Sequence, residues 1–340
     1  MLSTPGRGVF TLSLDFELAW GSRDLSDNIE PLLRLARVTR EQVFHPLLEL
    51  LESRGMSATW ATVGHLFLPS ARREAGRLHP QLTPPRHAWK PDWFAGVPEG
   101  DETSAPEFYA RSLVQRLLHS GQEVGSHGFS HPIYGDPGCT EEAARADLAA
   151  ARAAAADMGV TLRSFVFPRN VHGHLGLLRE AGFTCWRPLE PAWYRRPGVP
   201  GSVVRLAHLA DVARAACPAV VTPRVGDFGL VEYPASASFL PMEGVRRFIP
   251  MRQRVERCRR GLDRAAEEGK AFHLYSHPIN LASHPRVMLA AFGAVLDHAA
   301  RLRDAGRIEV LSMGAVADRL LATSIKSPAA RASSAPSSAG

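Results

Sequence analysis

Short apolar runs alternate with longer amphipathic segments along most of this chain. The first run, GVFTLSLDFE, covers residues 8–17, and a second, MSATWATVGHLF, covers residues 56–67. Between them, the apolar residues of 28–54 recur at helical spacing up to Gly55. A strand, a helix and a second strand in this order predict a βαβ unit with parallel strands.

The alternation continues toward the carboxyl terminus. We expect helices at 106–120 and at 140–158, the second of which is rich in alanine. The further expected strands are EVGSH at 123–127, LRSFVFP at 162–168, FTCWRP at 183–188, AFHLYSH at 271–277 and IEVLSM at 308–313. This order predicts an α/β fold with a mainly parallel sheet, which a chain of 340 residues can form as one domain, a barrel included.

Two segments break the alternation. Residues 69–105 are rich in proline and charge and lack clear periodicity, so we expect an insertion that runs over the surface or forms a lid. Residues 324–340 consist mainly of Ala, Ser and Pro, which cannot bury enough apolar surface to fold. We therefore expect one domain over residues 1–323, followed by a disordered tail.

The charge balance is basic, with a net charge of +6 and a pI near 9.5. The basic residues are densest in 246–264, where Val255, Cys258 and Leu262 recur at helical spacing. That spacing, with a single aromatic residue, favours a solvated helix over a nucleic-acid surface, so no nucleic acid is expected as a partner. Contact of this stretch with a membrane surface stays open.

Membrane spans, a secretion signal and cysteine spacing bear on the compartment of the protein. No apolar run reaches the length of a membrane span, and the first residues enter an expected strand without the apolar core of a secretion signal, so we expect a cytoplasmic protein. The four cysteines are scattered without a CxxC pair, which predicts neither a disulfide framework nor a thiolate metal cluster.

Polar side chains lie where the expected strands end. Asp15 and Glu17 close the first strand, His127 closes another, Arg169 follows a third and His277 closes a later one. In α/β barrels the carboxyl ends of the strands converge on one face, which holds the active site. Residues far apart in the sequence are therefore expected to meet there.

The segment SHGFSH places His127 and His131 four residues apart. If it turns helically, both imidazoles lie on one face and can bind one cation, which a carboxylate would complete. Asp15 and Glu17 point to the same side of a strand, so one can bind the metal while the other accepts a proton. Two histidines and one carboxylate leave coordination positions for water and substrate, as in catalytic metal sites.

Four segments in order, LSLDFE, SHGFSHP, SFVFPRN and HLYSHP, resemble the successive motifs of the NodB-like polysaccharide deacetylases, over roughly residues 8–320. The resemblance implies a distorted (β/α) barrel that hydrolyses an N-acetyl or O-acetyl group on a sugar with a divalent metal, usually Zn²⁺. It implies Asp15 as catalytic base, His277 as catalytic acid, and Glu17, His127 and His131 as metal ligands. The implied substrate is an acetylated glycan or a lipid- or nucleotide-linked sugar.

The chain departs from the family pattern at three places, one of which is the final motif, where Tyr275 and Ser276 precede His277 instead of a leucine and any residue. The family has adjacent aspartates where this chain has Asp-Phe-Glu, so the roles of Asp15 and Glu17 could be exchanged, and we favour Glu17 as the ligand. The family arginine that holds the base is replaced by Val166, and we expect Arg169 to hold Asp15 instead. These differences indicate a divergent branch.

Two other functions remain open. A metal-independent glycoside hydrolase could use Asp15 and Glu17 as its two carboxylates. A non-catalytic carbohydrate-binding barrel is the second alternative, because the family arginine is missing.

Overall fold

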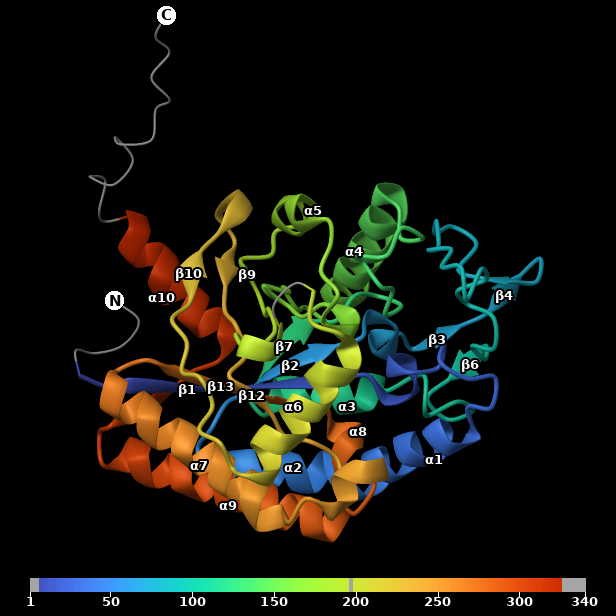
Figure 1. Ribbon diagram of the computed structural model, residues 1–340. Coiled ribbons are helices and arrows are strands. Elements are labelled where there is room, and N and C mark those ends of the chain that lie inside the picture. The colour runs from blue at the N-terminus through green and yellow to red at the C-terminus, as the bar shows by residue number, and fades with distance from the viewer. Residues whose placement is uncertain (1–5, 196–197, 326–340) are drawn as a thin grey trace, which may run out of the picture.

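The computed structural model describes residues 6–195 and 198–325, and its centre is one curled, mainly parallel sheet (Figure 1). The sheet runs in the order β10-β11-β9-β8-β7-β2-β1-β13-β12, and β14 pairs with β1 beside this path. The strands are β1 (Gly8–Phe16), β2 (Thr59–Thr62), β7 (Glu123–Ser126), β8 (Ser164–Phe165), β9 (Cys185–Trp186), β10 (Arg224–Val225), β11 (Val231–Glu232), β12 (Ala237–Ser238), β13 (Ala271–Ser276) and β14 (Ile308–Val310). The predicted barrel is confirmed in the form of a curled half-barrel that makes up a single α/β domain.

Helices surround the sheet. Figure 1 shows α2, α7 and α9 together below the central strands, whereas α4, α5 and α10 lie above them. The helices are α1 (Glu30–Val38), α2 (Phe44–Glu52), α3 (Arg111–His119), α4 (Glu141–Ala156), α5 (Leu175–Glu180), α6 (Gly201–Ala213), α7 (Met251–Glu268), α8 (Pro278–Leu281), α9 (Pro285–Asp304) and α10 (Met313–Ile325). The expected helix at 28–54 is interrupted by a π-helical turn, Thr39–Val43, that separates α1 from α2.

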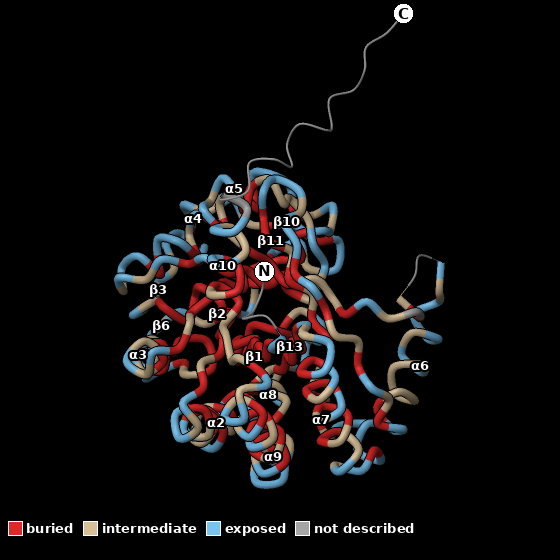
Figure 2. Tube along the Cα trace, turned by 90° about the vertical axis from the view of Figure 1, so that its left-hand side faces the viewer, coloured by how far each residue is buried: buried red, intermediate tan, exposed pale blue. Residues whose placement is uncertain are grey.

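The central strands are buried on both faces. All nine residues of β1 and all six of β13 are buried, and the two strands pair in parallel with Leu12 opposite Leu274. Figure 2 shows the buried trace concentrated at β1, β2 and β13, with exposed positions on the outer sides of the helices. Strands covered on both faces are near-continuous apolar runs, which explains why GVFTLSLDF lacks strict alternation.

The expected insertion at 69–105 folds back on itself through two small hairpins. β3 (Ser70–Ala71) pairs with β6 (Gly100–Asp101), and β4 (Arg73–Glu74) pairs with β5 (Arg77–Leu78). Trp93 and Val97 of this segment are buried, so part of it packs into the molecule. Its role as a lid stays a prediction. Most of the expected tail, from residue 326, lies outside the described residues.

The basic stretch at 246–264 is only partly solvated. It comprises the end of a 3-10 turn, Gly244–Phe248, and most of α7. Arg254 and Arg257 are buried, and they donate to the backbone carbonyls of Pro241 and Ala216. Two of its arginines therefore serve the fold rather than a partner, and membrane contact through the others stays a prediction. Within 6–195 and 198–325, every helix is too short or too polar to cross a membrane.

Candidate active site

The carboxyl ends of the central strands bring the predicted polar residues together. Asp15 lies near the end of β1 and Glu17 directly follows that strand, while His127 follows β7 and His277 follows β13. β13 and β1 are neighbours, and β2 separates β1 from β7. Because all of these strands are parallel, their carboxyl ends share an edge of the sheet. All four side chains face one another there, as the distances below show.

Glu17, His127 and His131 form a buried cluster. One carboxylate oxygen of Glu17 lies 2.9 Å from His127 Nε2 and 3.4 Å from His131 Nε2. One potential ligand atom from each residue lies within 4.8 Å of those of the other two. His127 Nδ1 donates to the Val166 carbonyl at 2.7 Å, which leaves Nε2 with a free lone pair for a metal.

His131 shows most directly that the cluster fits a cation. Its ring is buried, yet neither ring nitrogen has a hydrogen-bond partner. Buried polar atoms without partners are rare, and an ion accounts for such an atom. Two imidazole nitrogens and a carboxylate oxygen are suitable donors for a divalent metal such as Zn²⁺.

The segment SHGFSH does not turn helically. Residues 127–133 form an irregular loop, and His131 has a φ of 60°, outside the helical region. The loop is held by the buried carboxylate of Asp147 on α4, which accepts from Phe129 N at 2.7 Å, Ser130 N at 2.9 Å and the Tyr134 hydroxyl at 2.6 Å. Burial raises the pKa of Asp147 despite these donors. The two histidines therefore meet through a braced loop rather than through helical spacing.

Asp15 is held by Arg187. The two guanidinium nitrogens Nη1 and Nη2 donate to Oδ1 and Oδ2 of Asp15, each at 2.7 Å, and both side chains are buried. Burial alone would raise the pKa of Asp15, but the charge of Arg187 outweighs it and lowers that pKa. Arg187 also donates to Ser13 Oγ and to Asn170 Oδ1, so its position is fixed.

The expected contact between Arg169 and Asp15 is therefore wrong. Arg169 instead donates to Asp24 at 2.5 Å. The backbone explains the difference, because Arg169 adopts a left-handed φ of 53° directly after Pro168. Arg187 was missed, although it lies near the end of the expected strand FTCWRP, directly after β9, where the rule of strand ends applied to it equally.

His277 faces both carboxylates. Its Nε2 lies 3.5 Å from Asp15 Oδ2 and 3.4 Å from Glu17 Oε1, and 27% of its side chain is exposed. Burial disfavours the charged imidazole, but the Glu17 and Asp15 carboxylates outweigh it and raise the pKa of His277 to about 9. For Glu17, burial is likewise outweighed, chiefly by the positive charge of His277, and its pKa is lowered well below the usual range.

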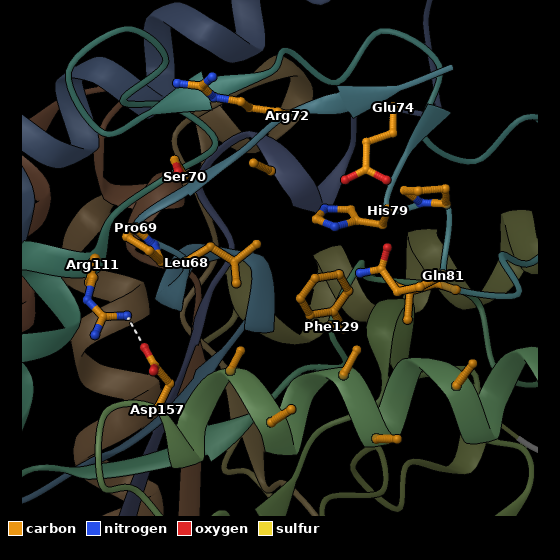
Figure 3. A pocket seen from close by; sticks show the side chains of 18 residues that line it. Leu68, Pro69, Ser70, Arg72, Glu74, His79, Gln81, Arg111, Phe129 and Asp157 are labelled. Carbon is orange, nitrogen blue, oxygen red and sulfur yellow. Dashed lines mark hydrogen bonds and ion pairs between the residues drawn. The ribbon is translucent and has the colours of Figure 1, made fainter. Parts of the chain in front are cut away.

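A separate cavity of about 860 Å³ lies between residues 68–82 and α4 (Figure 3). Leu68, His79 and Phe129 contribute to its walls, and alanines of α4 line it along one side. Arg111 and Asp157 form an ion pair of 2.8 Å at one end. The lining of the cavity includes Phe129 of the loop that carries both histidines, but none of the strand-end residues described above, so it is a different site.

The middle of the chain resembles a known protein family. Residues 36–185 match the family described as polysaccharide deacetylase. The match covers less than half of the chain, and this part of the sequence is similar to that family. The matched range contains His127 and His131, whereas Asp15, Glu17 and His277 lie outside it.

Solved structures share the fold of this chain. A protein from Mycobacterium smegmatis classed as a polysaccharide deacetylase aligns with 17% identity and a TM-score of 0.60, covering 95% of this chain and 93% of that one. PuuE allantoinase aligns with 12% identity and a TM-score of 0.60, over 95% and 93% of the two chains. A protein from Pseudomonas aeruginosa, also classed as a polysaccharide deacetylase, aligns with 12% identity and a TM-score of 0.59, over 93% and 92%. Among curated proteins, none matches this sequence significantly.

Proposed function

We propose that this chain is a metal-dependent hydrolase that removes an acetyl group, preferably an N-acetyl group, from a carbohydrate. The match of residues 36–185 to the polysaccharide deacetylase family supports carbohydrate deacetylation as the general activity. The observation that carries the finer proposal is the buried cluster of Glu17, His127 and His131, in which both ring nitrogens of His131 lack a partner. The substrate is an acetylated glycan or a lipid- or nucleotide-linked sugar.

Glu17, His127 and His131 are proposed to hold the metal, Zn²⁺ in our assignment. Glu17 is favoured over Asp15 as the ligand because both oxygens of Asp15 are already engaged by Arg187. Glu17 also belongs to both groups of residues that could bind an ion, the second group being Asp15, Glu17 and His277. A bound divalent metal would polarise the acetyl carbonyl and lower the pKa of a water molecule.

Asp15 is proposed to take the proton from the attacking water. Arg187 keeps the Asp15 carboxylate ionised and fixes its orientation. Each oxygen of Asp15 retains a lone pair that can accept the proton. Water attacks the acetyl carbonyl, and the bond from that carbon to the sugar nitrogen then breaks. His277, whose pKa of about 9 keeps it protonated at neutral pH, donates its proton to the leaving nitrogen.

The glycoside hydrolase alternative is less well supported. Such enzymes need one carboxylic acid that stays protonated near neutral pH. The pKa of Asp15 and that of Glu17 are both lowered. Neither carboxyl group is therefore suited to protonate a glycosidic oxygen.

The test is acetate release from acetylated oligosaccharides, assayed together with the formation of new reducing ends, with and without a chelator. We expect acetate without new reducing ends, loss of the activity with the chelator, and recovery when Zn²⁺ is restored. Reducing ends that form regardless of chelator would instead support glycoside hydrolysis. Oligosaccharide binding without acetate from any substrate would support the non-catalytic alternative.

A further inference from the structure

Three exposed apolar residues are linked to one ion pair near the proposed site, one by a hydrogen bond and two by their place in the sequence. Leu25, Trp89 and Val171 are 66%, 46% and 40% exposed. Leu25 follows Asp24 in the sequence, Trp89 donates to Asp24, and Val171 lies two residues after Arg169, the partner of Asp24. Exposed apolar groups gathered around one point indicate a binding surface rather than scattered surface residues.

Asp24 fixes two of the neighbouring side chains. Its side chain is fully buried, with Oδ1 accepting from Arg169 at 2.5 Å and Oδ2 accepting from Trp89 Nε1 at 2.9 Å. The exposed indole of Trp89 and the guanidinium of Arg169, which is 26% exposed, are thus held side by side. A preorganised pair of this kind loses little conformational freedom when a ligand binds.

The indole of Trp89 is supported from beneath. Its ring stacks on the His87 ring with centroids 4.8 Å apart and planes 10° apart. His87 is fully buried and is fixed by Asp136 at Nδ1, 2.7 Å, while its Nε2 accepts from Ile133 N. One face of the indole is therefore covered by a rigid ring.

This surface adjoins the proposed catalytic centre. Ile133, whose backbone N–H donates to His87, lies two residues after His131. On the other side, Asn170, the neighbour of Arg169, accepts from Arg187, which holds Asp15. Arg169 and Asn170 both adopt left-handed φ values, 53° and 55°. Such backbone strain in residues other than glycine is concentrated at functional sites.

We infer that Trp89 and Arg169 form a subsite for a second sugar ring, next to the ring that carries the acetyl group. The apolar C–H face of that sugar lies on the indole, and a ring hydroxyl oxygen accepts a hydrogen bond from the guanidinium. The inference rests on the proposed function and narrows the substrate to a glycan of at least two sugar units. Arg169 then has a binding role rather than the predicted role in holding Asp15.

The kinetic test uses N-acetylglucosamine and its β-1,4-linked tetramer as substrates for the metal-loaded protein. For Trp89→Ala we expect the KM for the tetramer to rise at least tenfold with kcat changed less than threefold, and the kinetics of the monomer to stay unchanged. Arg169→Met should raise the KM for the tetramer in the same selective way. Phe228→Ala is the matched control, because Phe228 is an aromatic residue 62% exposed on the turn between β10 and β11.

Binding separates this inference from the proposed function. If the wild-type protein releases no acetate, the proposed function fails, and calorimetric titration of the tetramer into the wild-type protein and into Trp89→Ala still tests the subsite. Weaker binding to the variant supports the subsite. Equal affinities, no binding to either protein, or equal kinetic losses for monomer and tetramer would overturn it.

Discussion

The pair formed by Arg187 and Asp15 can be tested by removing each charge in turn. The Arg187 side chain is fully buried and Asp15 is almost so, and two charge-assisted hydrogen bonds of 2.7 Å join them. Removing one partner leaves the other as an uncompensated buried charge, which costs about 3–5 kcal/mol. Since domains are stable by only about 5–15 kcal/mol, Arg187→Met should lose a large part of the free energy of unfolding.

Removing both charges should cost less than removing either. In the double variant Asp15→Leu/Arg187→Met, no charge remains unpaired, and apolar side chains of similar volume fill the space. We therefore expect the double variant to be more stable than both single variants, with a coupling energy of about 2 kcal/mol or more. Arg145→Met provides the control, because Arg145 forms exposed ion pairs with Glu141 and Glu180 and its loss should cost under about 1 kcal/mol.

The assay is denaturant unfolding followed by tryptophan fluorescence, with chelator present so that metal binding does not add to stability. Equal m-values across the four proteins would allow the free energies to be compared directly. Effects of the two single variants that add to within about 0.5 kcal/mol would refute the reasoning, because independent sites behave in that way.

Three further predictions concern the metal and pH. His127→Ala and His131→Ala should each lose most bound metal while staying folded, and His45→Ala, at an exposed position of α2, should retain it in elemental analysis. Asp15→Asn should keep metal and lose turnover, whereas Glu17→Gln should lose metal; the reverse result would exchange the two proposed roles. Burial, reinforced by the charge of Arg187, lowers the pKa of His273 to about 3. The unfolded chain therefore takes up a proton at His273 below about pH 6.5 that the folded protein does not, and the free energy of unfolding should fall by about 2 kcal/mol from pH 7 to pH 5 through this residue. His273→Gln should show a decrease smaller by that amount in denaturant titrations at the two pH values, and an equal decrease would contradict the assignment.

The strand ends could be predicted from the sequence because β1, β7 and β13 are apolar runs with polar residues at or directly after their carboxyl ends. Once a parallel sheet is inferred, Asp15, Glu17, His127 and His277 must approach one another. This part of the candidate site needs no knowledge of loops.

The positions of the site residues that lie on loops could not be predicted from the sequence pattern. His131 reaches Glu17 through a left-handed residue and a loop held by Asp147, and Asp147 lies 18 positions from the Phe129 N–H that it accepts from. The exchange of Arg169 for Arg187 has a similar cause. Both follow neighbouring strands, but only the backbone turn after Pro168 directs Arg169 toward Asp24. Such long-range and dihedral choices are set by tertiary packing, which periodicity does not record.

The central claim is that water attacks an acetyl carbonyl at the site formed by Glu17, His127, His131 and Asp15. Hydrolysis in ¹⁸O-labelled water, followed by mass spectrometry of acetate and sugar, tests it most directly. The account predicts one ¹⁸O atom in each released acetate, and no label in the sugar of an N-acetylated substrate beyond the exchange at its reducing end that also occurs without protein. Label at the anomeric carbon of a shortened sugar, with no labelled acetate, would contradict it.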